Sequence, residues 1–233
     1  MRKLCAAFEK ARKRQISKML TFDEATHRYH FDGAPVPNVT RVLDYFCHSF
    51  DHVAPTVLEN ARQEGQAVHR TIEYYLRGTL DHENLPAWLH PYIEAFEQFR
   101  TDTGFELEAS EQRLWHPLQQ YAGTLDLVGW MNYAKLGRRH VLIDLKRSFA
   151  AGDAIGLQLA AYASAYNATL HDRFVAGHIL DEGQGRIQNR FALRFRPEMS
   201  PPYATLHFTD ANDFPTFHAM CVTYKYLEAH GKL

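Results

Sequence analysis

The stretch HVLIDLKRS, residues 140–148, holds an aspartate and a lysine within an apolar run. Apolar runs of this length that are rich in Val, Ile and Leu are typical of buried central strands. Side chains alternate between the two faces of a strand, so we expect Asp144 and Lys146 on the same face. A buried, ionised carboxylate needs a metal ion or a cationic partner, because burying it alone is energetically costly.

A second carboxylate occupies a similar position upstream. The segment YAGTLDLVGW, residues 121–130, holds Asp126 within another apolar run. Two carboxylates on neighbouring strands can hold a divalent cation such as Mg²⁺, which prefers oxygen ligands. Together with Lys146 they make up the groups needed to hydrolyse a phosphodiester bond with metal-bound water. The residues alone leave an alternative, in which Asp144 and Lys146 are edge-strand charges and Asp126 caps a turn.

The segment GLQLAAYASAY, residues 156–166, predicts a helix directly after the second apolar run. Gln158 and Tyr162 are four residues apart and therefore share one face of this helix. They can hydrogen-bond to a phosphate or a base, or they can pack in the core with partners for their polar atoms. From the residues alone, core packing is the favoured interpretation.

The remaining segments predict an α/β fold. The dipeptide Asp32-Gly33 lies in an alternating stretch and signals a hairpin turn. The order of helix, three strands, helix and further strands favours an α/β/α sandwich on a mixed central sheet. Strands are expected at residues 106–115, 120–131, 139–147, 174–180, 186–195 and 203–208. We divide the chain into a basic N-terminal helix, a single domain and a helical insertion within that domain, at residues 1–20, 21–233 and about 53–104 respectively.

These segments together resemble the RecB-type branch of the PD-(D/E)XK nuclease superfamily, and they are similar to phage exonucleases and mitochondrial genome maintenance exonucleases. The motifs that carry the resemblance are GTLDLVG, IDLKRS and LQLAAYASAYN, preceded by RYHFDGAPVPNVTRVL and by EGQAVHRTIEYYL with its Gly-x-x-x-His spacing. The resemblance extends from about Tyr29 to Asn167. It implies a PD-(D/E)XK nuclease-like sandwich.

The resemblance also implies roles for individual residues. Asp126 and Asp144 are the expected metal-binding acids, and His69 is the expected nitrogen ligand. The carbonyl of Leu145 is a further candidate ligand, because backbone oxygens coordinate hard cations. Lys146 is expected to position the attacking hydroxide, to stabilise the transition state or to act as a base. Three more residues are expected in the catalytic site, namely Gln158, Tyr162 and the upstream Glu111.

The implied activity is that of a metal-dependent deoxyribonuclease with one or two Mg²⁺ or Mn²⁺ ions. We expect an exonuclease that acts on DNA with free ends or on single strands, in recombination, repair or replication, with a recombination or replication protein as the expected kind of partner. The alternatives are a structure-specific or site-specific endonuclease and a non-catalytic nucleic-acid-binding module. Some relatives carry an iron–sulfur cluster on four cysteines, and Cys5, Cys47 and Cys221 are too few to build one.

Bulk properties narrow the class of protein. The 233 residues carry 26 basic and 27 acidic side chains, which is not the strongly basic balance of a tight non-specific nucleic-acid binder. No apolar run approaches the length of a membrane span. The cysteines show no disulfide or metal-binding spacing and suit a reducing compartment. We therefore expect a cytoplasmic protein without a membrane partner.

Two segments supply local positive charge. Residues 1–20 predict a basic amphipathic helix, which either presents a solvated face or contacts DNA. Arg186, Arg190 and Arg194 share one parity along a predicted strand whose other parity is apolar. Such a row of arginines can follow a phosphate backbone, and a solvent-exposed sheet face gives the same pattern. Together with Arg147, these arginines are the candidate nucleic-acid-binding residues.

Overall fold

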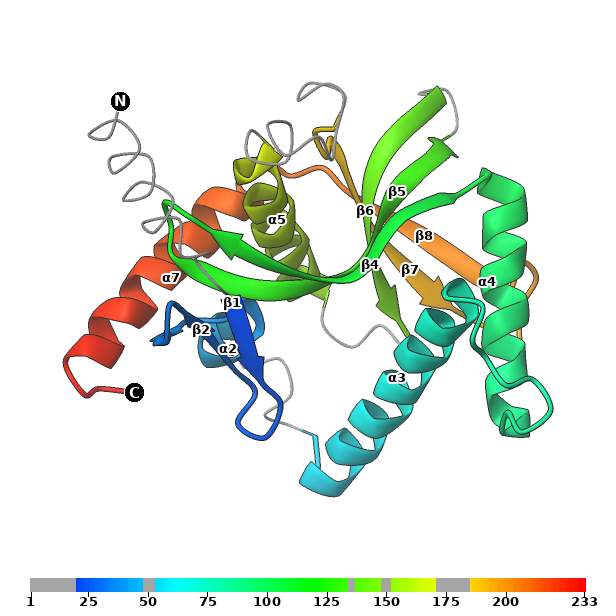
Figure 1. The fold of residues 1–233 in the computed structure, drawn as a ribbon, viewed down its shortest axis with the longest axis horizontal. Coiled ribbons are helices and arrows are strands. Elements are labelled where there is room, and N and C mark those ends of the chain that lie inside the picture. The colour runs from blue at the N-terminus through cyan, green and yellow to red at the C-terminus, as the bar shows by residue number, and fades with distance from the viewer. Residues whose placement is uncertain (1–19, 48–52, 134–136, 148–151, 171–184) are drawn as a thin grey trace, which may run out of the picture.

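The computed structural model describes residues 20–47, 53–133, 137–147, 152–170 and 185–233 (Figure 1). Its centre is a five-stranded sheet with the order β4-β5-β6-β7-β8. These strands are β4 (Glu106–His116), β5 (Tyr121–Tyr133), β6 (Gly137–Lys146), β7 (Asn189–Phe195) and β8 (Tyr203–Phe208). The pair β6–β7 is parallel, and the other neighbouring pairs of this sheet are antiparallel. The predicted mixed central sheet is therefore confirmed.

Helices cover both faces of this sheet (Figure 1). One layer consists of α2 (Val39–Cys47), α5 (Gly152–Ala168) and α7 (Asp213–Ala229). The other consists of α3 (Pro55–Leu76) and α4 (His90–Thr103), with the short 3₁₀ helix η1 (Ala87–Leu89) leading into α4. The predicted α/β/α sandwich is therefore confirmed, and the helices expected in the insertion form its second layer.

The alternation of side chains in the central strands produces two separate cores. Val128 and Leu142 pack in the core on the side of α5 and α7. Leu127 and Ile143, their immediate neighbours in sequence, pack in the other core with residues of α3 and α4. Because the middle parts of β5 and β6 are covered on both faces, residues 125–131 and 141–145 are apolar apart from Asp126 and Asp144. A charged residue in this covered part of either strand therefore lies against protein and needs a partner.

A smaller antiparallel sheet precedes the sandwich in sequence. It consists of β1 (Leu20–Asp23), β2 (Arg28–Phe31) and β3 (Ala34–Val36). Asp32 and Gly33 connect β2 to β3 with positive φ angles of 51° and 81°, as a two-residue hairpin loop requires, so the predicted hairpin is confirmed. The ring of Phe31 stacks on Trp115 of β4 with 4.1 Å between centroids, which attaches this sheet to the central one.

The first strands of the central sheet approach each other closely at Gly129. The ladder between β4 and β5 shifts register between Leu107 and Ala109, opposite this glycine. A Cβ atom at Gly129 would lie 2.2 Å from the backbone oxygen of Glu106 and 2.9 Å from the ring of Phe105. Only glycine fits here without movement of the backbone.

Two predicted elements lie outside the described residues. These are the basic helix at residues 1–20, of which only Leu20 is described as the start of β1, and the strand at residues 174–180. The division of the chain into domains stays a prediction. Among the helices that the structure describes, none combines the length and the apolar character needed to cross a bilayer.

Candidate active site

The two central strands bring Asp126 and Asp144 together. In the antiparallel ladder of β5 and β6, Leu127 pairs with Ile143, so the next residues along the two strands are Asp126 and Asp144. Asp144 is only 3% exposed. Its Oδ2 atom lies 2.7 Å from Nζ of Lys146, which confirms that both side chains project from the same face of β6. The ammonium group supplies the cationic partner that a buried carboxylate requires.

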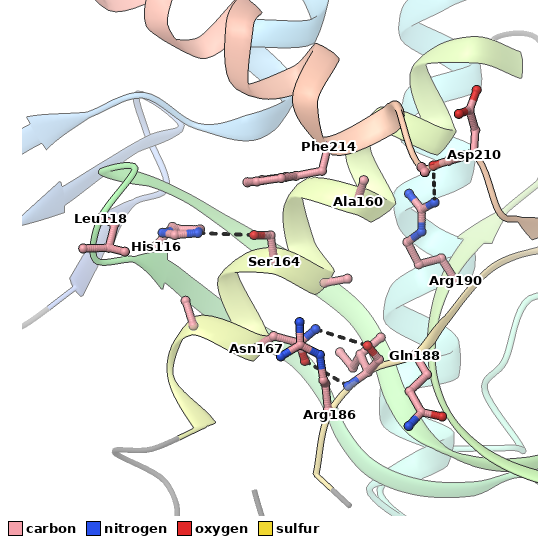
Figure 2. Close-up of a pocket in the computed structure, with 14 residues that line it drawn as sticks. His116, Leu118, Ala160, Ser164, Asn167, Arg186, Gln188, Arg190, Asp210 and Phe214 are labelled. Carbon is pink, nitrogen blue, oxygen red and sulfur yellow. Dashed lines mark hydrogen bonds between the residues drawn. The ribbon is translucent and has the colours of Figure 1, made fainter. Parts of the chain in front are cut away.

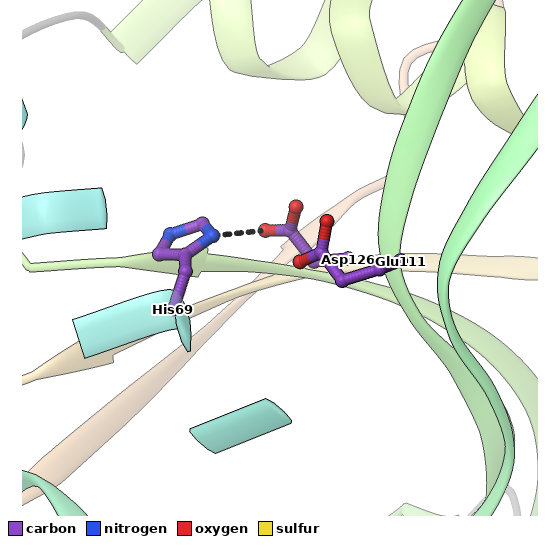
Figure 3. Close-up of side chains that lie close together, drawn as sticks. All are labelled: His69, Glu111 and Asp126. Atoms are coloured by element: carbon purple, nitrogen blue, oxygen red, sulfur yellow. Dashed lines mark ion pairs between the residues drawn. The ribbon is translucent and has the colours of Figure 1, made fainter. Parts of the chain in front are cut away.

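Asp126 is held in place by the backbone of β6. The N–H group of Leu145 donates a hydrogen bond of 2.7 Å to Oδ2 of Asp126. The same oxygen lies 3.6 Å from Nδ1 of His69, which reaches the site from α3 (Figure 3). The carboxylate of Asp126 is therefore fixed on one side by a strand and faces a helix on the other.

The orientation of the His69 ring follows from its second nitrogen. Nε2 of His69 lies 2.8 Å from the carbonyl oxygen of Leu145. A carbonyl oxygen can only accept, so Nε2 carries a hydrogen, and in the neutral ring Nδ1 has its lone pair on the side of Asp126. Histidines that bind metals usually donate their other N–H to such an acceptor. The Leu145 carbonyl, predicted as a metal ligand, thus orients His69 in this structure.

Glu111 completes a group of potential metal ligands. It lies in β4 between Ser110 and Gln112, whose ladder partners flank Asp126 in β5. Its φ angle of 48° is unusual for a residue other than glycine, and such a conformation costs about 1–3 kcal/mol. His69, Glu111 and Asp126 each offer one ligand atom, and these atoms all lie within 4.8 Å of one another. The strained backbone thus directs Glu111 toward the same centre.

Crowding of carboxylates changes the protonation of Glu111. Burial, followed by the negative charges of Asp126 and Glu73, raises the pKa of Glu111 to about 8. At neutral pH the folded protein therefore binds a proton at this site that the unfolded chain releases. A divalent cation would replace this proton, because it neutralises the same charges.

A dependence of stability on pH follows from this protonation. Between the ordinary pKa of 4.5 and the folded value of about 8, the folded state holds one proton more than the unfolded state at Glu111. The free energy of unfolding in EDTA is therefore expected to fall as the pH rises through this window. Urea unfolding near both ends of the window measures the change. The variant Glu111→Gln should show a smaller change, and an unchanged pH dependence in that variant would contradict the assignment.

The pKa of Lys146 bears on its role. Burial acts to lower this pKa, and the carboxylates of Asp144 and Asp126 outweigh burial and raise it above the usual value. Of the roles expected for Lys146, action as a base requires the neutral amine, which a raised pKa disfavours, and the assignment of its role stays a prediction. The direction of the shift favours a charged lysine that stabilises negative charge.

Gln158 and Tyr162 lie on the face of α5 that packs against β5. Tyr162 is 4% exposed, and a Cβ atom at Gly123 would lie 2.5 Å from its ring. Nε2 of Gln158 donates a hydrogen bond of 3.2 Å to the hydroxyl group of Tyr162. Core packing, which the residues alone favoured, therefore describes Tyr162. The catalytic roles of both residues stay predictions.

A cavity of about 500 Å³ opens onto the candidate site. His69, Glu111 and Lys146 line it together with Arg147 of the segment that follows β6. Further polar side chains of α3 on its wall were not predicted from the sequence, namely those of Arg62, Gln66, Arg70 and Glu73. Gln66 and Glu73 lie three and four residues from His69 and therefore share its face of the helix, whereas Arg62 and Arg70 lie seven residues and one residue away from it.

The predicted row of arginines on β7 is not an exposed basic face. Nη1 of Arg190 lies 2.9 Å from Oδ2 of Asp213, and its guanidinium donates to the carbonyls of Gly156 and Asp210. Arg190 therefore connects the start of α7 to α5, and Figure 2 shows its guanidinium pointing to Asp210. Its predicted contact with DNA stays a prediction. Arg194 is half-buried in the same central strand.

The other two predicted arginines lie in different places. Arg186 is exposed, precedes β7 and lines a second cavity of about 480 Å³ (Figure 2). Arg147 lines the first cavity, and its Nη2 atom lies 2.5 Å from Oε2 of Glu64 on α3. Of the four arginines, Arg147 is thus the one beside the candidate site.

The second cavity contains a histidine next to a serine. Nδ1 of His116 accepts a hydrogen bond from the backbone N–H of Gln119, so Nε2 carries the hydrogen in the neutral ring. Nε2 therefore donates to Oγ of Ser164, 3.3 Å away (Figure 2). A ring nitrogen that donates to the hydroxyl cannot accept its proton, so this pair is not arranged as a nucleophile with its base.

Comparisons with known proteins give limited results. No family model matches the chain, and no curated protein matches it. The chain is similar to a solved structure described as "Crystal Structure of LHK-Exo in complex with dAMP", with 13% identity and a TM-score of 0.35. The match covers 84% of this chain and 89% of that one. These values are too low to transfer the activity of that protein.

Proposed function

We propose that this protein is a metal-dependent nuclease that hydrolyses phosphodiester bonds in DNA from free ends. The observation that carries the proposal is the convergence of His69, Glu111 and Asp126 next to the ion pair of Asp144 and Lys146. Three potential ligands and a lysine that is paired with a buried carboxylate are groups that suit metal-assisted phosphodiester hydrolysis. The proposed preference of the nuclease for free DNA ends rests on the resemblance in sequence alone.

The donor set fits a divalent cation. Two carboxylates and one ring nitrogen present their atoms within 4.8 Å of one another. Carboxylates suit Mg²⁺ and Mn²⁺, and the imidazole makes Mn²⁺ at least as suitable as Mg²⁺. When bound, such a cation supplies Lewis-acid activation of water and of the phosphate. His69, Glu111 and Asp126 would hold it.

Lys146 and Leu145 contribute to the site in addition to the potential metal ligands. Lys146 stays charged beside Asp144, with 26% of its side chain exposed on the cavity wall. Its ammonium group is suited to stabilise the negative charge that develops on the phosphate during cleavage. Leu145 orients two partners at once, because its N–H binds Asp126 and its carbonyl binds His69.

A cleavage assay tests the proposal directly. End-labelled linear single strands, linear duplexes and covalently closed circles are incubated with Mg²⁺, Mn²⁺ or EDTA. Loss of linear DNA with metal, while circles stay intact, supports the exonuclease, and the labelled products give its polarity. Cleavage of circles supports an endonuclease. Binding without cleavage of any substrate contradicts the enzymatic proposal and supports the non-catalytic module.

Arg147 is expected to contribute a phosphate contact. Replacing it with alanine should weaken binding of single-stranded DNA and lower the slope of log affinity against log salt concentration by about 1, because one charge–phosphate contact is lost. Fluorescence anisotropy across a salt series measures both. Arg138→Ala is the matched control, since this arginine is also ion-paired but at the opposite end of β6. An unchanged salt slope for Arg147→Ala would contradict the contact.

A further inference from the structure

Neither the local backbone conformation nor close packing explains why residue 65 is a glycine. It lies near the middle of α3, a helix of 22 residues. Glycine within a helix is less favourable than alanine, so it is usually explained by a turn or by a close packing contact. The φ angle of Gly65 is not positive, and a Cβ atom at this position would meet no described residue within 4 Å. Neither its own backbone conformation nor packing against the part of the chain that the structure describes requires a glycine here.

The open space beside Gly65 is the cavity of the candidate site. Gly65 lines this cavity one helical turn before His69. Arg62 and Arg70 line it from the same helix, and Lys146 lines it from the end of β6. The helix surface at Gly65 is therefore flanked by arginines, of which Arg62 is ion-paired with Glu59, and it lies beside the potential metal ligands.

Positively charged side chains lie on both sides of the cavity next to Gly65. Arg147 follows β6, and its guanidinium pairs with Glu64, the residue before Gly65. This ion pair is partly exposed, so it contributes little to stability and can exchange for a pair with a phosphate. An anion that enters over Gly65 thus meets arginines on α3 and a further arginine opposite them.

We infer that Gly65 keeps open the path along which the sugar–phosphate backbone of the cleaved strand crosses α3 to reach the site. This inference rests on the proposed nuclease function. A nucleic-acid backbone is a linear array of phosphates, and it matches a passage bordered by arginines. A helix surface without a side chain lets such a backbone approach closely. Gly65 is accordingly a positioning residue that gives up helix stability for access.

Side chains of increasing size at Gly65 test the inference. Gly65→Ala is expected to raise the midpoint of thermal unfolding, because alanine favours the helix and meets open space. Affinity for a fluorescently labelled single-stranded oligonucleotide should fall with alanine and by about tenfold or more with leucine, since displacement of a bound strand by an ångström is costly. KM should rise more than kcat falls. Mn²⁺ affinity by calorimetry should stay unchanged.

Gln63→Leu is the matched control, because this exposed residue belongs to the same helix and does not line the cavity. Oligonucleotide affinity of Gly65→Leu equal to that of the wild type would overturn the inference. A loss of Mn²⁺ affinity in Gly65→Leu would also overturn it, since the glycine would then serve the metal ligands. If the wild-type protein binds the oligonucleotide but does not cleave DNA, the proposed nuclease function is rejected, and the affinities of the Gly65 variants still test the proposed path of the strand. If the wild-type protein does not bind the oligonucleotide, both proposals are rejected.

Discussion

Replacing Lys146 with alanine is expected to lower the rate of DNA cleavage by about 10²- to 10³-fold, the usual effect of removing a group that stabilises developing charge. The distance of 2.7 Å between Nζ and Oδ2 of Asp144 fixes the ammonium group at the wall of the cavity. Because Lys146 is not among the potential metal ligands, affinity for Mn²⁺ should change little. Single-turnover cleavage and calorimetry measure the two quantities.

The same substitution also leaves Asp144 buried without its cation. Loss of one partner of a buried ion pair costs about 3–5 kcal/mol of stability, so lost activity must be separated from unfolding. The control is the double variant Asp144→Leu/Lys146→Met, which removes both charges. It should be more stable than either single variant and should remain inactive. A stable double variant that cleaves DNA at the wild-type rate would show that the pair is structural and would contradict the proposed mechanism.

Gly129→Ala is expected to produce the largest loss of stability among substitutions of glycine in the central sheet. The added Cβ would meet the backbone oxygen of Glu106 at 2.2 Å, and a backbone atom cannot move aside as a side chain can. We expect the free energy of unfolding to fall by about 3 kcal/mol, at the upper end of the usual cost of overpacking. Urea unfolding monitored by circular dichroism measures this change.

Alanine substitutions at two other glycines serve as comparisons for the stability of Gly129→Ala. At Gly123 the added Cβ meets the ring of Tyr162 at 2.5 Å, and the ring can shift, so a smaller loss is expected. At Gly65 it meets open space. The expected order of stability is thus Gly65→Ala, then Gly123→Ala, then Gly129→Ala. Equal stability of Gly129→Ala and the wild type would show that β4 can separate from β5 at the register shift.

Much of the site could be predicted from the sequence because its residues lie in regular elements. Alternation along a strand is enough to place Asp144 and Lys146 on one face, and the ion pair of 2.7 Å agrees. Alternation cannot tell whether that face meets water or another layer. For this reason the alternation along β7 predicts an exposed basic face, whereas Arg190 lies under α7 and pairs with Asp213.

The parts of the site that could not be predicted from the sequence depend on contacts between segments that are distant in sequence. The carbonyl of Leu145 orients His69 across 76 residues of sequence, and no local pattern predicts such a contact. The positive φ angle of Glu111 is likewise a property of the folded ladder, since isolated glutamate disfavours it. The sign of the Lys146 pKa shift depends on how closely two carboxylates approach, which strand assignments do not give.

The three potential ligands belong to different parts of the sandwich. His69 lies on a helix of one covering layer, whereas Glu111 and Asp126 lie on neighbouring strands of the sheet. In the unfolded chain they are far apart, so a cation that requires all three binds only the native state. Its binding free energy is then linked to folding. Once the cation exceeds its dissociation constant, each tenfold rise in its concentration adds about 1.4 kcal/mol to the free energy of unfolding.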